Sequence, residues 1–141
     1  MTERPRILFL CTANSARSQL AEAILRDRAA DRMAVCSAGT NPSTVHPLAI
    51  EVLAEEGISS EGLRSTSVED VLRDGPGSLT IAVCASAAEH CPVVAGEQVR
   101  SWPFDDPAAC DGDDEAKRNA FRTARDAIAS KIDAWLEAGG V

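Results

Sequence analysis

Apolar residues along the chain follow two alternating patterns. Short continuous runs lie at 7–10, 33–36, 79–84 and 99–102. Such runs are typical of strands that are buried on both faces of a sheet. The segments between them carry apolar residues three to four positions apart, which is the spacing of an amphipathic helix. Because strands and helices alternate, the pattern predicts an α/β fold: a single doubly wound domain with a four-stranded parallel sheet flanked by helices.

Helical spacing predicts three long helices and one short one. The long helices cover about residues 17–30, 46–56 and 114–137. Thr66 and Glu69 have the spacing of a capping box and predict a short further helix that ends at the turn-forming residues 74–77. The last helix presents one apolar face, formed by Phe121, Ala124, Ile128, Ile132 and Trp135.

Length and composition bound the class of protein. The chain has 141 residues, enough for one domain with a real core, so we expect a single domain over residues 1–141 that acts as a monomer. No apolar run approaches the length needed to cross a bilayer, so we expect no membrane partner. Residues 1–5 lead into the first strand without a signal peptide, which predicts a cytoplasmic protein.

Charge and cysteine content narrow the chemistry further. The net charge of -8 argues against nucleic acid or an anionic membrane as a partner, because both require a basic face. Five cysteines favour catalytic or redox thiols over a disulfide framework, with Cys36 expected in the core and Cys110 in an acidic surface loop. Zinc is not expected, because there is no C-x2-C pair and neither His46 nor His90 stands at zinc spacing to the cysteines. We expect no metal and no tightly bound cofactor.

The strongest chemical signal lies where the first strand passes into the first helix. Cys11 ends the strand and Arg17 begins the helix, and the five residues between them are small or polar: Thr12, Ala13, Asn14, Ser15 and Ala16. A loop that opens a helix directs several backbone N–H groups at one point, and the positive end of the helix dipole favours an anion there. The segment from Thr12 to Ser18 therefore predicts a cradle for a tetrahedral oxyanion.

Cys11 is the expected nucleophile of this cradle. The helix N-terminus and the nearby arginine favour the thiolate over the thiol, and the Ser18 hydroxyl can donate to the sulfur. Arg17 offers a planar fork that matches two oxygens of an oxyanion. A cysteine and an arginine would by themselves fit a buried strand end and a solvated helix turn. The strand–loop–helix context favours the functional site.

At these residues the chain resembles the low-molecular-weight protein tyrosine phosphatase superfamily, whose loop reads C-x5-R-[ST]. A narrower resemblance, to the thioredoxin-coupled arsenate reductases of that superfamily, spans nearly the whole chain. It rests on residues 11–22, Ser37-Ala38-Gly39, Cys84 through Cys91-Pro92, and residues 102–108. The resemblance implies the phosphatase-like α/β fold and the reduction of arsenate to arsenite for arsenic detoxification. The second cysteine pair distinguishes these reductases from the phosphatases that share the loop.

The resemblance also implies a relay of three thiols. Cys11 would attack arsenate and release water, and Cys84 would then attack the Cys11 sulfur and expel arsenite. Cys91 would take over the bond to Cys84, which leaves a Cys84–Cys91 disulfide for thioredoxin. These two cysteines stand seven residues apart. On an intact helix their sulfurs would lie roughly 10 Å apart, so forming the disulfide requires the segment to unwind or bend.

A general acid is expected near the cradle, because attack by Cys11 expels an oxygen that needs a proton. We choose Asp106, because it precedes Pro107 as the acid does in the family's Asp-Pro pattern, and the proline restricts its backbone to an extended conformation. Asp105 is the competing choice, and the sequence leaves the two open. Cys11 and Cys84 also follow predicted strands, so all these residues should meet at one edge of the sheet.

Two positions depart from the family pattern. Ala16 stands where some members have an extra cysteine, which removes none of the implied steps. Some members bind potassium through Asn, Glu and Asp near the loop. Asn14 and Glu22 match the first two ligands, but Ser67 stands at the third position. We therefore do not expect bound potassium, and we assign Asn14 and Glu22 to bracing the loop.

Other functions stay open at this point. A low-molecular-weight phosphatase would use Cys11, Arg17 and Asp106 with a phosphocysteine intermediate, although the chain has no tyrosine and only three phenylalanines to grip a phosphotyrosine. A thiol sensor would bind arsenite through Cys84, Cys91 and a third sulfur, but it gives Arg17 no role. The external reductant is expected to be thioredoxin, and mycothiol or glutaredoxin could serve the same first thiolate.

Overall fold

The strands and helices form in the order that the sequence predicts. In a computed structural model, which describes residues 5–73, 79–83 and 99–140, the chain forms four strands and four α-helices. The strands are β1 (Arg6–Cys11), β2 (Ala34–Gly39), β3 (Leu79–Ala82) and β4 (Val99–Ser101). The helices are α1 (Arg17–Ala29), α2 (Pro47–Glu55), α3 (Val68–Leu72) and α4 (Asp114–Glu137), with a 3-10 turn, η1, at Pro107–Ala109.

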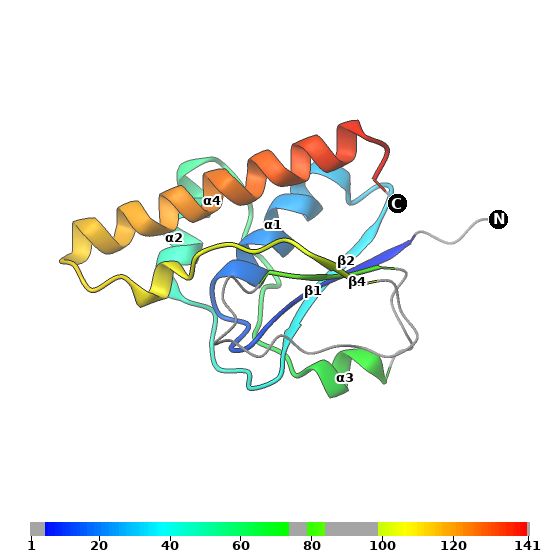
Figure 1. Cartoon of the computed structure of the whole chain (residues 1–141), viewed down its shortest axis with the longest axis horizontal. Helices are drawn as coiled ribbons and strands as arrows, with labels where there is room; N and C mark the ends of the chain where they lie inside the picture. Colours follow the sequence, from blue (N-terminus) through cyan, green and yellow to red (C-terminus); the bar gives the residue numbers. More distant parts are fainter. Residues whose placement is uncertain (1–4, 74–78, 84–98, 141) are drawn as a thin grey trace.

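The four strands form one parallel sheet in the order β2-β1-β3-β4 (Figure 1), which confirms the predicted fold class. β1 pairs with β2 along its whole length, from Arg6 opposite Ala34 to Cys11 opposite Gly39. Because this pairing continues to the end of β1, β2 extends beyond residue 36, where the apolar run ends. Ser37 is polar and yet buried, so the hydropathy pattern could not mark this extension.

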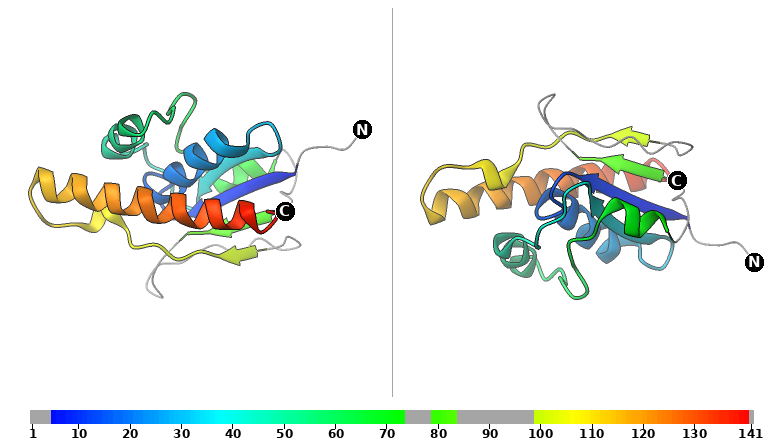
Figure 2. Two further views of the ribbon diagram at one scale, coloured as in Figure 1. Left: turned by 90° about the horizontal axis from the view of Figure 1, so that it is seen from above. Right: turned by 90° about the horizontal axis from the view of Figure 1, so that it is seen from below.

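Helices cover both faces of the sheet. Figure 1 shows α1, α2 and α4 on one side and α3 on the other, and the view from below in Figure 2 shows α3 in front of the sheet. Ile7 and Phe9 of β1 belong to the larger core, which they share with residues of α1, α2 and α4. Leu8 and Leu10 belong to the smaller core, with Val71 of α3. β1 is therefore buried on both faces and gives the loop that follows it a rigid base.

The longest helix, α4, begins and ends at the predicted residues. Its predicted apolar face is buried, at Phe121, Ala124, Ile128, Ile132 and Trp135. This face packs mainly against α1 and α2, and one charged residue, Arg125, is buried with it. Within the described residues, no helix combines the length and apolar character that crossing a membrane requires.

The start of α3 corrects one prediction. Ser67, and not Thr66, caps this helix, because the Ser67 hydroxyl accepts a hydrogen bond from the Asp70 N–H at 3.1 Å. The Thr66 N–H donates instead to the Asn14 side-chain oxygen at 2.8 Å. A capping box that starts at Thr66 is therefore wrong by one residue. The pattern could not see that a buried asparagine 52 positions earlier requires the Thr66 amide.

Candidate active site

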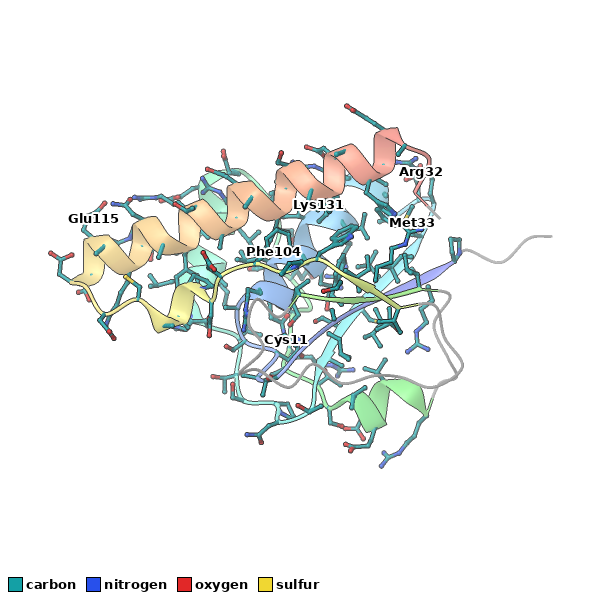
Figure 3. All side chains as sticks on the ribbon, in the orientation of Figure 1. Cys11, Arg32, Met33, Phe104, Glu115 and Lys131 are labelled. Atoms are coloured by element: carbon teal, nitrogen blue, oxygen red, sulfur yellow. The ribbon has the colours of Figure 1, made fainter. Side chains whose placement is uncertain are left out.

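Cys11 lies at the carboxyl end of the central strand, directly before the loop of residues 12–16 that leads into α1 (Figure 3). It is buried, with 3% of its surface exposed. Its Sγ lies 3.1 Å from the Ser18 Oγ in the first turn of α1. No acidic residue stands in that turn, and Ala16 at the N-cap has no side-chain cap. The positive end of α1 is therefore left for an anion beside the sulfur.

The carbonyl groups of the first four loop residues are held by groups outside the loop. The carbonyls of Thr12, Ala13, Asn14 and Ser15 accept hydrogen bonds of 2.9 to 3.1 Å from the backbone N–H groups of Asn41, Ser43 and His46, the Ser65 hydroxyl and the Gln19 side-chain amide. In a trans peptide the C=O and the following N–H point in opposite directions. These bonds therefore turn the N–H groups of residues 13–16 toward the cradle. Within the described part of the chain, those four N–H groups donate to no other group.

Asn14 ties this loop to three other segments. Its backbone has φ of 50°, a left-handed conformation that asparagine tolerates better than most residues. Its side chain is fully buried, and its amide nitrogen donates to Ser18 Oγ at 2.8 Å and to Ser37 Oγ at 3.0 Å. With the bond from the Thr66 N–H, one side chain connects the loop to α1, to β2 and to the segment before α3. The bracing role expected for Asn14 has this geometric basis.

Gly39, the last residue of β2, allows the loop to approach the sheet. A Cβ at this position would lie 2.4 Å from the Thr12 carbonyl oxygen and 3.0 Å from the Asn14 side chain. The first of these contacts is with backbone, which a side-chain rotation cannot relieve. Glycine is therefore required here by space and not by φ.

Glu22 extends the polar network below the loop. The residue is buried, and one carboxylate oxygen accepts a hydrogen bond from Ser37 Oγ at 2.6 Å. The other oxygen pairs with Arg26, one helical turn later in α1. Burial raises the pKa of Glu22, while the Ser37 hydrogen bond and the Arg26 charge act in the opposite direction. Ser37 thus receives a hydrogen bond from Asn14 and donates one to Glu22.

These residues do not fit a potassium site. The Asn14 side-chain oxygen already accepts from the Thr66 N–H, and the Ser67 hydroxyl caps α3. The Glu22 carboxylate already has a cation beside it, the Arg26 guanidinium. In the described ranges, no group of three or more histidine, cysteine, aspartate or glutamate side chains is arranged to hold a metal ion. We therefore derive no step through a bound cation.

Arg17 brings the segment between β4 and α4 to the cradle. Its side chain is buried, and its Nη1 donates to the Phe104 carbonyl at 3.2 Å. Its Nη2 lies 3.7 Å from the Asp106 carboxylate, which is 37% exposed. Asp106 also caps η1, because its other oxygen accepts from the Ala108 N–H at 3.0 Å. Of the two candidate acids, Asp106 is the one that the structure places beside Arg17.

His46 is a site residue that the sequence pattern did not identify, because position 46 marks only the start of the predicted helix over residues 46–56. It does cap α2, but its backbone N–H also holds the Ser15 carbonyl at 2.9 Å. Its ring packs on Phe121 of α4, with the ring centroids 4.5 Å apart. Burial lowers the pKa of His46, the Asp106 charge opposes this, and Lys117 adds to the lowering. The His46-Pro47 pair signals a helix start but gives no sign of contact with the loop.

The other cysteines divide into two groups. Cys84 and Cys91, the two further thiols of the expected relay, lie outside the described residues. Cys36 and Cys110 are half-buried. Cys36, which was expected in the core, lies at its margin: it packs against the smaller core from the edge strand β2, and it also lines a polar cavity of about 240 Å³ together with Arg6.

Comparison with known proteins connects this geometry to a family. Residues 6–138 match the family described as low molecular weight phosphotyrosine protein phosphatase. An arsenate reductase from Halalkalibacterium halodurans is 38% identical over 134 residues, which cover 94% of this chain and 96% of that protein.

Solved structures agree with this assignment. A structure described as an arsenate reductase in the phosphate binding state superposes with a TM-score of 0.77 at 27% identity, covering 95% of this chain and 98% of that one. A thioredoxin-dependent arsenate reductase from Corynebacterium glutamicum gives a TM-score of 0.73 at 26% identity, covering 97% of this chain and 62% of that one. The chain therefore belongs to the low molecular weight phosphotyrosine protein phosphatase family and is a homologue of its arsenate reductases.

Proposed function

We propose that this protein reduces arsenate to arsenite, with Cys11 as the nucleophile and Arg17 as the residue that holds the oxyanion. The observation that carries the proposal is the loop geometry. Four carbonyls are held outward, the N–H groups of residues 13–16 are turned inward, and the Cys11 sulfur and the end of α1 lie beside them. This arrangement suits a tetrahedral oxyanion. The names of its relatives favour arsenate as that oxyanion.

In the first step, the Cys11 thiolate attacks arsenic and forms an S–As bond. One arsenate oxygen leaves, and it has to leave as water. The backbone N–H groups of the loop and the Arg17 guanidinium stabilise the negative charge on the remaining oxygens. The Ser18 hydroxyl, 3.1 Å from the sulfur, stabilises the thiolate before the attack.

Asp106 would supply the proton to the leaving oxygen. Its carboxylate lies 3.7 Å from Arg17, the same side chain that would hold the substrate, so it stands at the rim of the cradle. Its 37% exposure lets it recover a proton from solvent between turnovers. Pro107 and the Ala108 N–H fix its orientation. These contacts favour Asp106 over Asp105 for the role.

The second and third steps would use Cys84 and Cys91. The Cys84 thiolate attacks the Cys11 sulfur, the S–As bond breaks, and its electron pair stays on arsenic, which leaves as arsenite. Cys91 then attacks Cys84 and releases Cys11 as a thiolate. One arsenate and two thiols thus give one arsenite, one disulfide and water. A thioredoxin-type dithiol would reduce the Cys84–Cys91 disulfide, which suits a reducing compartment such as the cytoplasm.

The test is arsenate-dependent consumption of NADPH in the presence of thioredoxin and thioredoxin reductase. Wild-type protein should turn over, and Cys91→Ser should not. Cys110→Ser is the matched control, because it removes a thiol that has no part in the relay, and it should turn over normally. A Cys91→Ser variant that turns over normally would exclude the relay, and so would a wild-type protein that consumes no NADPH with thioredoxin, glutaredoxin or mycothiol. Replacing thioredoxin by glutaredoxin or mycothiol in the same assay identifies the reductant.

A phosphatase activity is the second candidate, because the family is named for it and the same cradle suits phosphate. It would need only Cys11, Arg17 and Asp106, with water hydrolysing a phosphocysteine. The two functions separate at Cys84. In a reductase, Cys84→Ser should lose multiple turnover of arsenate while keeping slow hydrolysis of p-nitrophenyl phosphate. Fast hydrolysis of that ester by the wild type, with no arsenate turnover, would favour the phosphatase.

A further inference from the structure

His46 connects the catalytic loop to two helices. Its backbone N–H donates to the Ser15 carbonyl at 2.9 Å, and Ser15 is the second residue before the helix that carries Arg17. Its own carbonyl accepts from the Ala49 N–H at 3.0 Å, as part of the first turn of α2. Its ring packs on Phe121 in the buried face of α4. The His46 N–H keeps the Ser15 carbonyl turned away from the cradle. A shift at the start of α2 would therefore move this donor and release the carbonyl.

The imidazole performs its capping role only in its neutral form. Its Nδ1 accepts a hydrogen bond from the Leu48 N–H at 3.1 Å, so the ring proton has to be on Nε2. Protonation would place an N–H against the Leu48 N–H and would add a positive charge at the positive end of α2. Both effects would weaken the first turn of this helix.

The charged groups that act on the ring come from two other elements. Asp106, which caps η1, attracts a positive charge on the imidazole, and Lys117 of α4 repels one. The first turn of α2 contributes no acidic residue. Burial lowers the pKa of His46, so the ring is neutral near pH 7 and takes up its proton at a pH below the ordinary histidine range.

We propose that His46 is a positioning residue for the oxyanion cradle, and that its neutral imidazole keeps the Ser15 carbonyl turned outward by fixing the start of α2. Protonation of the ring frees this carbonyl to rotate toward the cradle, where it repels an oxyanion and removes an N–H donor. Oxyanion binding therefore weakens in acid through the cradle itself, without any change at the Cys11 sulfur. The inference rests on the proposed function only in requiring that the cradle bind a tetrahedral oxyanion.

The experiment measures how inorganic phosphate protects Cys11 from iodoacetamide, with the alkylation of the Cys11 peptide followed by mass spectrometry. Phosphate is tetrahedral, and thiols cannot reduce it, so the result is independent of Cys84, Cys91 and any reductant. The apparent Kd is measured from about pH 8 to about pH 4.5. Wild type is compared with His46→Asn, which offers a capping oxygen that does not titrate, and with His46→Ala, which offers none.

Three different pH profiles are expected. Wild type should lose about fivefold more affinity than His46→Asn between the two ends of the range, which is the size of effect expected for losing a helix cap. His46→Ala should be about fivefold weaker than wild type already at pH 8, and it should not lose the additional affinity in acid. The titration of phosphate is common to all variants and cancels in the comparison. His90→Asn, which changes the other histidine, should follow wild type.

Two outcomes would overturn the proposal. The first is that the affinities of wild type and His46→Asn for phosphate change in parallel with pH. The second is that His46→Ala binds phosphate as tightly as wild type at pH 8. Either result would mean that the ring does not control the cradle. Circular dichroism at each pH verifies folding, and His46→Ser provides a second capping variant if the asparagine fails to fold. Arsenate reduction could fail in its own assay while these profiles stay as expected, so the two failures are distinguishable.

Discussion

Two glutamates that pair with arginines have pKa values shifted in opposite directions. Glu22 on α1 is buried, and the loss of water raises its pKa despite the Ser37 hydrogen bond and the Arg26 charge. Glu55 on α2 is exposed, and hydrogen bonds from Arg122 and Arg125 lower its pKa to about 2. Ionisation is therefore disfavoured at Glu22 and favoured at Glu55, although both carboxylates pair with arginine. The difference lies in what surrounds the carboxylate.

The two residues belong to networks with different functions. Glu22 belongs to a cradle network formed by Asn14, Ser18, Glu22, Arg26 and Ser37. Glu55 belongs to a flank network between α2 and α4, formed by Glu51, Glu55, Glu115, Arg118, Arg122 and Arg125. Most members of the flank network are exposed or half-buried, so solvent and salt screen their short ion pairs, and each of these pairs contributes little to stability; Arg125 alone among the six is buried. The cradle network has mostly buried groups joined by hydrogen bonds, and it fixes the loop that holds Cys11.

The largest expected difference in activity is between an arginine at the cradle, Arg17, and an arginine of the flank network, Arg122. Arg17→Lys should lower kcat/KM for arsenate by about a hundredfold or more, because an ammonium cannot replace the planar fork that holds two oxygens. The matched change on the flank, Arg122→Lys, should leave kcat/KM unchanged. Steady-state kinetics of both variants, with thermal melts as a folding check, measures the difference. Near wild-type activity of Arg17→Lys would remove Arg17 from the oxyanion site.

The second prediction compares the two glutamates directly. Glu22→Ala should lower the free energy of unfolding by about 2 kcal/mol, because the buried Ser37 hydroxyl loses its acceptor and a space opens below the loop. Glu55→Ala should have a smaller effect, and the effect should shrink further in high salt. Urea unfolding at low and high salt tests both variants. Equal losses would mean that burial does not separate the two networks.

The sequence predicted the fold, and it marked Cys11 and Arg17 as the candidate reactive pair with Asn14 and Glu22 as braces, but it did not indicate most of the groups that hold the loop. The alternation of apolar runs gave the parallel sheet, and helical spacing gave α4 with its buried face. Cys11 and Arg17 were recognisable because the strand–loop–helix context lies within a few residues. The supports of the loop, including Ser65 and Gly39, come from distant segments. Their roles depend on backbone contacts that no periodicity encodes, and for the same reason the capping box was placed one residue early.

Gly39 allows a test of how tightly the cradle is built. Gly39→Ala should lower kcat/KM about tenfold, because the new Cβ would lie 2.4 Å from the Thr12 carbonyl oxygen and would push the loop away from β2. The control is Gly62→Asn, at an exposed position with φ of 81°, where no atom of the described residues lies within 4 Å of a new Cβ. It should retain full activity, since asparagine tolerates that conformation. Comparison of their arsenate kinetics tests the contact, and an active Gly39→Ala variant would contradict it.

The smallest effect expected is on the pH dependence of stability, and here the two glutamates act with opposite signs. A carboxyl with a raised pKa takes up its proton earlier in the folded state, so Glu22 adds stability as pH falls from 7 toward 4.5. A carboxyl with a lowered pKa stabilises the folded state above pH 4.5, and this contribution is lost as pH falls from about 4.5 to about 2. Urea midpoints measured across this range should therefore change differently in two isosteric variants. Glu22→Gln should remove the gain in the upper window, and Glu55→Gln should reduce the loss in the lower one. If both variants altered the same window, the environments of the two carboxylates would not differ as their contacts indicate.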